Sequence, residues 1–111
     1  MNYKIHISLS QRQLALFQDN QLVRTYPVAI GKSHSPSPTG SFKITSKFMH
    51  PGGPFGLLWL GLSAKGYGIH GTNNPASIGK FASKGCIRMY NRDVLELAQH
   101  VAIGTPVIIE K

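Results

Sequence analysis

Cysteine is nearly missing from this sequence, because Cys86 is the only one among 111 residues. A disulfide framework within the chain is therefore excluded, and so is a zinc site built from several cysteines. Acidic residues are also few: 4 Asp and Glu stand against 12 Lys and Arg, which gives a net charge of +8. Such an imbalance either keeps the surface solvated or attracts a polyanion, and both nucleic acid and an anionic bacterial wall polymer fit the second interpretation.

Long apolar runs are missing as well. No stretch approaches the length of about 20 residues that a membrane-spanning helix needs, so no membrane span is predicted. Residues 1–6 alternate polar and apolar side chains and lack the apolar core of a signal peptide. We expect no signal peptide in this chain: either it is not exported by that route, or the signal has been removed. No basic stripe is interleaved with aromatic residues, so binding of nucleic acid would rest on net charge alone and is not predicted.

The dominant pattern in the sequence is alternation of apolar and polar residues. An apolar content of 41% and the chain length fit one globular domain over residues 1–111. Strands are predicted at 3–9, 13–18, 22–30, 42–48, 57–62, 67–70 and 107–109, with Pro- and Gly-rich loops at 31–40 and 50–56. One short helix near the C-terminus is predicted, with Asn91 as its N-cap and Gly104 at its end. The expected fold is mainly β, a sandwich or barrel-like sheet with that single helix.

The neighbours of Cys86 give it a chemistry that a lone cysteine does not have. His70 follows a predicted strand and can serve as a base, while Lys84 and Arg88 flank the thiol and favour its ionisation. Main-chain N–H groups in the turn at 83–86 can point at a developing oxyanion, and Gly85 leaves room for a substrate carbonyl. These residues alone indicate a Cys–His enzyme, against the alternatives of a structural histidine and a buried, inert cysteine.

A metal site is the other chemistry that these residue types allow. It would combine Cys86 and His70 with His50 or His100. Their spacings match no compact ligand motif, so neither a metal site nor a cofactor is predicted.

The motifs around Cys86 closely resemble the signature of the YkuD-type L,D-transpeptidase catalytic domain. They comprise His70-Gly71-Thr72, then Ser83-Lys84-Gly85-Cys86-Ile87-Arg88-Met89, then Asn91 and Asp93. Earlier segments also match, namely Pro38-Thr39-Gly40, and Pro51 to Gly56 with Trp59-Leu60. The resemblance extends over about residues 3–109, and the chain closely resembles the Bacillus-type enzyme, without a LysM module.

The resemblance implies a mostly β fold and acyl transfer on peptidoglycan stem peptides, with a tetrapeptide donor and an amine acceptor. A thioester forms on the cysteine, D-Ala leaves, and an amine resolves the thioester to give 3-3 cross-links or amine exchange. An L,D-carboxypeptidase of the same chemistry and a non-catalytic wall-binding module remain as alternatives. The resemblance also implies that the protein is a target of carbapenems and acts in wall biogenesis and cell shape. The implied location is the cell wall, with spore association as one form of it.

Residue roles follow from the resemblance by position. Cys86 is the nucleophile and His70 the general base and acid. The residues implied to orient the imidazole or form the oxyanion hole are Gly71, Ser83, Lys84 and Gly85, with the Cys86 amide. Those implied to bind substrate are Arg88, Trp59, Tyr67 and Asn91, Arg88 holding either the loop or the donor carboxylate. Many family members have His where this chain has Lys84, which puts a proton-relay role at that position in doubt.

Overall fold

The computed structural model describes residues 2–111, which form ten strands, one α-helix and two short 3-10 helices. The strands are β1 (Tyr3–Ser8), β2 (Gln13–Gln18), β3 (Gln21–Pro27), β4 (Ile30–Gly31), β5 (Gly40–Met49), β6 (Leu58–Leu62), β7 (Gly68–His70), β8 (Phe81–Ser83), β9 (Ile87–Arg88) and β10 (Pro106–Glu110). The helices are α1 (Asn91–Ala98), η1 (Gly53–Phe55) and η2 (Pro75–Ser77). The prediction of a mainly β fold with one short helix near the C-terminus is confirmed.

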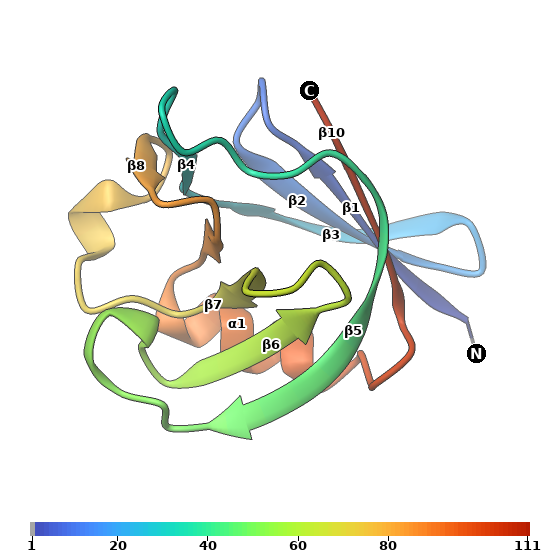
Figure 1. The fold of residues 1–111 in the computed structure, drawn as a ribbon. Coiled ribbons are helices and arrows are strands. Elements are labelled where there is room, and N and C mark those ends of the chain that lie inside the picture. The colour runs from blue at the N-terminus through green and yellow to red at the C-terminus, as the bar shows by residue number, and fades with distance from the viewer. Residues whose placement is uncertain (1) are drawn as a thin grey trace.

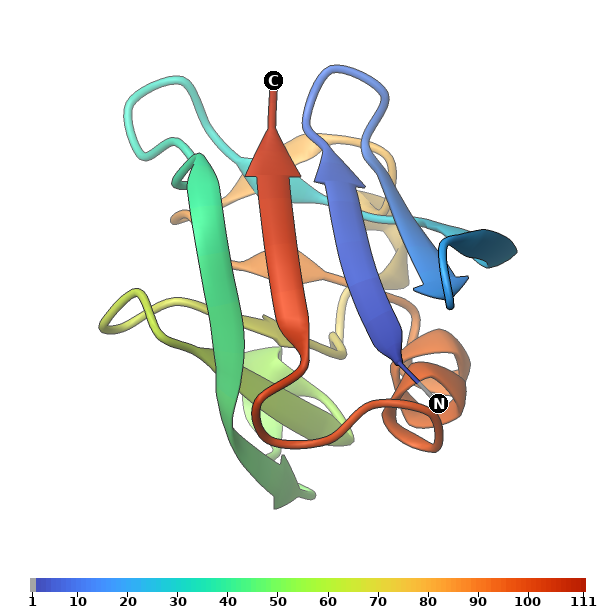
Figure 2. The same ribbon diagram turned by 90° about the vertical axis from the view of Figure 1, so that its right-hand side faces the viewer.

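Eight of these strands form one curled sheet in the order β3-β2-β1-β10-β5-β6-β7-β9, and β4 pairs separately with β8 (Figure 1). Strand β10 lies between β1 and β5 (Figure 2), parallel to β1 and antiparallel to β5. The first and last strands are therefore neighbours in the middle of the sheet, and because they are parallel the two ends of the described chain lie at opposite ends of this pair.

The curl of the sheet encloses the core. Inward positions alternate along the strands, as Ile5 and Ile7 on β1 and Val107 on β10 show by their complete burial. Helix α1 adds Val94 and Leu97 from its inner face and packs against β6 and β7. Each such side chain contributes about 1.5–3 kcal/mol when it is removed from water. This core fixes β7, β9 and the start of α1, which carry the residues singled out in the sequence.

The predicted strand 22–30 is in fact two strands with different partners. Strand β3 pairs with β2 and ends at Pro27, whose nitrogen carries no hydrogen for a ladder. The chain then turns away, and Ala29 exchanges main-chain hydrogen bonds with Arg88 before β4 pairs with β8. Periodicity did not reveal β8 and β9, because they are only three and two residues long.

The helix is shorter than predicted at its C-terminal end, and its N-cap is a different residue. Tyr90, not Asn91, is the N-cap, and no side chain caps it. The helix stops at Ala98, well before Gly104, whose N–H instead donates to the Ile44 carbonyl at 2.7 Å. The Lys47 ammonium donates to the Ala98 carbonyl at 2.6 Å, and a cation at a helix C-terminus is favourable.

Candidate active site

The residue singled out as base lies on strand β7, and the residue singled out as nucleophile directly precedes the neighbouring strand β9 of the same sheet. Strand β7 pairs in parallel with β9, with His70 opposite Arg88, and on its other side His70 lies opposite Trp59 of β6. Side chains at paired positions project from the same face of a sheet. Cys86 is two residues before Arg88, and this spacing returns to the same face of an extended chain. The sheet thus directs Cys86, His70, Arg88 and Trp59 to one side.

A tight loop presents the thiol at the entrance to β9. The hydroxyl of Ser83 donates to the Cys86 carbonyl at 2.6 Å and accepts from the Gly85 N–H at 3.1 Å. Gly85 has φ of +123°, and a Cβ there would run into the ring of Tyr67. The loop therefore needs glycine at this position for its backbone and for its packing. The Gly85 N–H, one of the expected oxyanion donors, is thus engaged inside the loop.

The thiol of Cys86 is half-buried, with its Sγ 3.9 Å from the Gly66 carbonyl oxygen. Burial raises the pKa of Cys86, while a main-chain hydrogen bond from Gly68 and the charge of Arg88 lower it. Burial dominates, so the resting group is the thiol and a base is needed to ionise it. Lys84, expected to help, is exposed and does not contribute to this pKa.

His70 is a buried imidazole held by the main chain of the next residue. Its Nδ1 lies 2.5 Å from the carbonyl oxygen of Gly71, and this contact is a hydrogen bond only when Nδ1 carries the proton. That tautomer leaves Nε2 with the free lone pair. Burial lowers the pKa of His70, Arg88 lowers it further, and the bond to Gly71 works in the opposite direction. The neutral form of the imidazole, which is the form a base needs, is thereby favoured.

Two aromatic rings cover this imidazole. Trp59 stacks on it with ring centroids 5.5 Å apart and planes inclined by 13°, and Phe55 meets it edge-on at 5.1 Å. Trp59 can lie this close to the sheet because Gly68 lacks a side chain: a Cβ there would come within 2.5 Å of the indole. The indole therefore forms a wall of the site beside the base.

Asn91 connects the segment after His70 to the start of α1. Its Oδ1 accepts from the N–H groups of Leu57 at 3.1 Å and Thr72 at 3.2 Å, and its Nδ2 donates to the Thr72 carbonyl at 3.1 Å. A Cβ at Gly71 would overlap Oδ1, so the carboxamide occupies the space that this glycine leaves. Asn91, which the sequence predicted as the helix cap, instead bonds with its side chain to the main chain beside the base.

Arg88 lies near both reactive groups and has no carboxylate partner among the described residues. Its Nη1 donates to the Ser77 hydroxyl at 3.3 Å, and its buried Nε has no hydrogen-bond partner. A guanidinium without a carboxylate partner can donate hydrogen bonds to a substrate carboxylate.

Four neighbours of the site were not singled out in the sequence: Phe55, Gly68, Thr72 and Ser77. Phe55 and Thr72 do stand inside quoted motifs, which was the available signal. Nothing in the sequence pattern indicated Ser77, which contacts Arg88 only through the fold.

The metal alternative has no support in the described residues. No group of three or more His, Cys, Asp or Glu side chains in residues 2–111 lies close enough to hold a metal ion. His100 packs on Tyr3, with ring centroids 5.5 Å apart. Within the same residues, no helix is both long and apolar enough to cross a membrane.

This fold, with its Cys86 loop and its covered His70, defines a known class. The family model described as the L,D-transpeptidase catalytic domain, YkuD, matches residues 2–109, and the chain belongs to this family. It is 57% identical over 107 residues to the protein named L,D-transpeptidase YkuD of Bacillus licheniformis, and 54% identical over 109 residues to its Bacillus subtilis namesake. These alignments cover 96% and 98% of this chain but 65% and 66% of the two relatives. The chain thus spans just under two thirds of their length.

Solved structures share the fold at lower identity. An L,D-transpeptidase from Mycobacterium smegmatis superposes with a TM-score of 0.88 at 19% identity, covering 99% of this chain and 59% of the other. L,D-transpeptidase 3 from Mycobacterium tuberculosis, in complex with a faropenem-derived adduct, gives 0.85 at 21% identity, covering 98% and 60%. At such identities the likeness establishes the architecture.

Proposed function

We propose that the chain is an L,D-transpeptidase that acts on peptidoglycan stem peptides through a thioester on Cys86, as a cysteine acyltransferase of the bacterial envelope. The observation that carries the proposal is the covered His70, its Nδ1 fixed by Gly71, on the strand next to the one that Cys86 enters. Membership of the family supplies the substrate class. Wall biogenesis, an effect on cell shape and a cell-wall location, with spore association as a form of it, belong to the same proposal.

Acylation begins with transfer of the Cys86 proton to Nε2 of His70. The thiolate attacks the carbonyl carbon between the L-centre of diaminopimelate and the terminal D-Ala, and the N–H of Cys86 stabilises the oxyanion. When the C–N bond breaks, the imidazolium returns the proton to the departing D-Ala amine. The thioester is left on Cys86, and the base is neutral again.

Deacylation reverses these roles with a different amine. His70 takes a proton from the acceptor amine as its nitrogen attacks the thioester carbonyl. The C–S bond breaks, and the sulfur regains a proton from the imidazolium. In this proposal Arg88, whose guanidinium has no carboxylate partner among the described residues, holds the donor carboxylate, while Trp59 and Tyr67 form walls of the cleft.

Intact-protein mass spectrometry after incubation with a carbapenem tests the nucleophile, because the β-lactam carbonyl mimics the donor amide. We expect a mass increase of one carbapenem in the wild type and none in Cys86→Ala. Cys86→Ala and His70→Ala are each expected to abolish cross-linking of muropeptides. Near-normal activity of Cys86→Ala would overturn the proposal, and failure of the wild type to be labelled would support a non-catalytic wall-binding module.

An L,D-carboxypeptidase is the second candidate, because water could reach the same thioester at the half-exposed Cys86. Analysis of products with and without an acceptor amine separates the two activities. A transpeptidase yields the amide of the added amine, whereas a carboxypeptidase yields the tripeptide acid under both conditions.

A further inference from the structure

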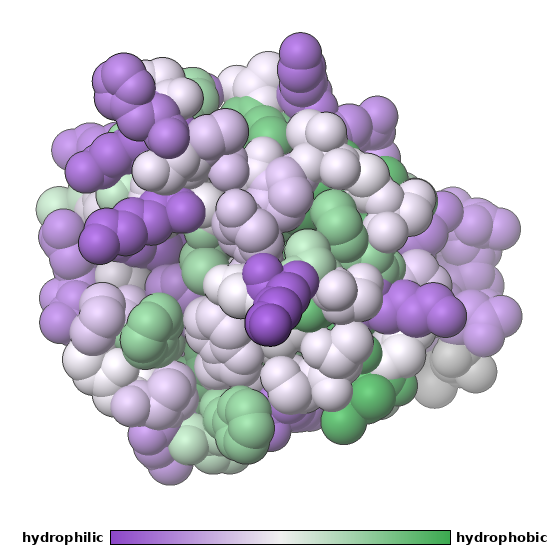
Figure 3. Space-filling view, viewed as in Figure 1, coloured by the Kyte–Doolittle hydropathy of each residue, from purple (hydrophilic) through white to green (hydrophobic). Residues whose placement is uncertain are grey.

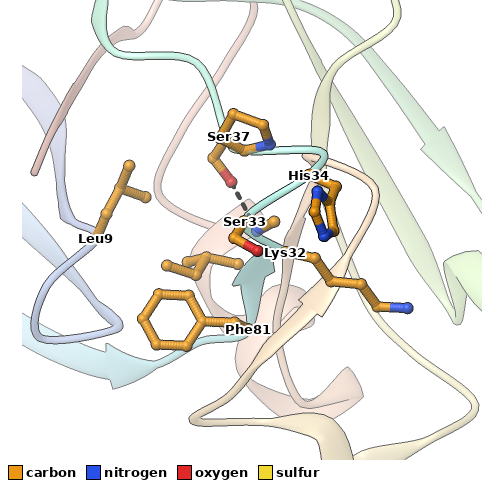
Figure 4. A pocket seen from close by; sticks show the side chains of 9 residues that line it. Leu9, Lys32, Ser33, His34, Ser37 and Phe81 are labelled. Atoms are coloured by element: carbon orange, nitrogen blue, oxygen red, sulfur yellow. Dashed lines mark hydrogen bonds between the residues drawn. The ribbon is translucent and has the colours of Figure 1, made fainter.

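A pocket of about 630 Å³ opens beside the nucleophile loop, between the 32–37 loop and β8. This volume lies within the range of about 300–1,000 Å³ typical of small-ligand sites. Figure 4 shows Leu9 and Phe81 on one side of it and the side chains of Lys32 and His34 on the other. None of these residues takes part in the chemistry proposed above.

The floor of this pocket is apolar, and part of it is unusually accessible. Ile30 is buried at its base, whereas Phe81 leaves 58% of its surface exposed. The guanidinium of Arg12 lies 5.1 Å from the centroid of the Phe81 ring. An exposed phenyl group with a cation against it offers an apolar surface to a ligand and positive charge next to it.

The rim supplies hydrogen-bond donors and positive charge without a matching partner. Lys32, Ser33 and His34 are consecutive and exposed, and their side chains form no hydrogen bond or ion pair within residues 2–111. None of the nine residues that line the pocket is acidic. The acidic side chains of the chain lie in the β2–β3 turn, on α1 and at the end of β10, where Glu110 pairs with His6. The pocket therefore complements an anion.

The pocket and the nucleophile share a wall. The Lys32 N–H donates to the Ser83 carbonyl at 3.0 Å, and the Pro36 carbonyl oxygen would lie 3.3 Å from a Cβ on Gly85. Phe81 precedes Cys86 by five residues, which span at most about 17 Å even when fully extended. A wall polymer bound in this pocket would thus lie alongside a stem peptide bound at Cys86. On the face seen in Figure 3, hydrophilic side chains gather over β4 and β8.

We propose that this pocket binds a phosphate-bearing sugar unit of the bacterial wall, a choice of occupant that rests on the proposed function. The C–H face of the sugar packs on Phe81 and Leu9, its hydroxyls bond to Ser33 and His34, and the phosphate pairs with Lys32. A neutral sugar would form no ion pair with Lys32, and inorganic phosphate would make no apolar contact with Phe81 and Leu9. The charge of the chain, +8, favours approach of such an anionic polymer.

Titration of the full chain with N-acetylglucosamine 6-phosphate, followed by two-dimensional NMR, tests this proposal. We expect chemical-shift changes concentrated in residues 30–37 and at Phe81, and affinity about tenfold weaker in Phe81→Ser and in Lys32→Gln, a loss of about 1.4 kcal/mol. Matched controls are Leu22→Ser, whose side chain is also 58% exposed, and Lys4→Gln on β1. Both should bind as the wild type does.

Three outcomes would overturn the proposal. Equal affinity for N-acetylglucosamine or for inorganic phosphate would show that only half of the ligand is recognised. Equal weakening by Lys4→Gln would show attraction by overall charge, and equal weakening by Leu22→Ser would show that loss of any exposed apolar side chain has the same effect. Tighter binding of a single-stranded oligonucleotide to the same residues would indicate a nucleic-acid site. The sugar phosphate is expected to bind Cys86→Ala as well as the wild type, so failure of the proposed catalytic function would leave this result standing.

Discussion

The imidazole of His70 is controlled more by its neighbours than by its own type. Its Nδ1 is hydrogen-bonded to the Gly71 carbonyl. Two aromatic rings contact the imidazole: Trp59 stacks on it, and Phe55 meets it edge-on. The charged group that acts on it is Arg88, from the neighbouring strand β9. Each of these contacts can be changed singly, which makes the base the natural place for residue-scale predictions.

Replacing Trp59 by Leu is expected to shift the acidic limb of the kcat/KM profile to higher pH. Burial lowers the pKa of His70, so exposing one face of its ring raises that pKa toward its ordinary value near 6.5. The imidazole then becomes protonated, and useless as a base, at a higher pH as the solution is acidified. Trp59→Phe keeps a stacked ring and should keep the wild-type limb. An unmoved limb in Trp59→Leu, together with an unmoved His70 titration by NMR, would contradict this prediction.

Replacing Asn91 by Ala is expected to lower kcat by a factor of about ten to a hundred, because misplacement by about 1 Å can cost that much. The variant frees the N–H groups of Leu57 and Thr72 and the Thr72 carbonyl, next to the Gly71 carbonyl that holds the base. Steady-state kinetics should show the loss in kcat rather than in KM. The exposed neighbour Asn73→Ala serves as the control. A loss confined to KM would instead favour the substrate-binding role that the family resemblance implies for Asn91.

At the scale of elements, helix α1 is attached to the outer strand β3 by one polar cluster. The Tyr26 hydroxyl donates to Glu96 at 2.7 Å, and Arg24 pairs with the same carboxylate at 3.0 Å. Burial, followed by the hydrogen bond to Glu96, raises the pKa of Tyr26 well above its ordinary value. This cluster holds α1, and with it Asn91, against the sheet.

Tyr26→Phe is expected to lower the free energy of unfolding by about 1–2 kcal/mol at neutral pH, since it removes one hydrogen bond to a charged group. It should also weaken the loss of stability in alkali. The folded-state pKa lies above the unfolded value, so this contribution is complete below about pH 10 and is lost as the pH rises beyond it. Chemical denaturation at pH 8 and pH 10.5 measures both effects. A wild type and variant that lose stability equally between these pH values would contradict the second.

Elements with a strong period were predictable from the sequence, and elements defined by long-range partners were not. Strands β1 and β2 follow from alternation, because one face of each is buried in the core. Strands β8 and β9 are too short to carry a period, and the break after Pro27 reflects the pairing of Ala29 with Arg88. The end of α1 depends on Lys47, 51 residues away in sequence from the Ala98 carbonyl that it binds.

Some features of the site were likewise predictable from the sequence, and others were not. Cys86 and His70 were predicted from residue types and the family motif, and in the structure His70 lies on β7 while Cys86 directly precedes the neighbouring strand β9. The aromatic cover by Phe55 and the engagement of the Gly85 N–H depend on geometry that no spacing rule encodes. Arg88 lowers the pKa of Cys86 as expected from its position, but burial raises this pKa by more, and burial could not be predicted from the sequence.

At the scale of the whole molecule, the sheet depends on its last strand. Strand β10 fills the gap between β1 and β5 and buries Val107 and Ile109 in the core. Removing residues 105–111 would expose the edges of both neighbours and open the core. We expect the truncated chain to lose cooperative unfolding by circular dichroism and dispersion of its NMR spectrum. Removing Lys111 alone should change neither, and a cooperative transition in the longer truncation would contradict the prediction.

The position of β10 also orders events during synthesis of the protein. Strand β1 precedes β10 by about 100 residues, so during synthesis β1 can acquire this neighbour only after residue 110 has emerged from the ribosome. Domains with such distant pairings fold slowly, because about 100 residues of loop must be closed before the contact forms. The nascent chain therefore remains without its finished sheet until β10 has been synthesised.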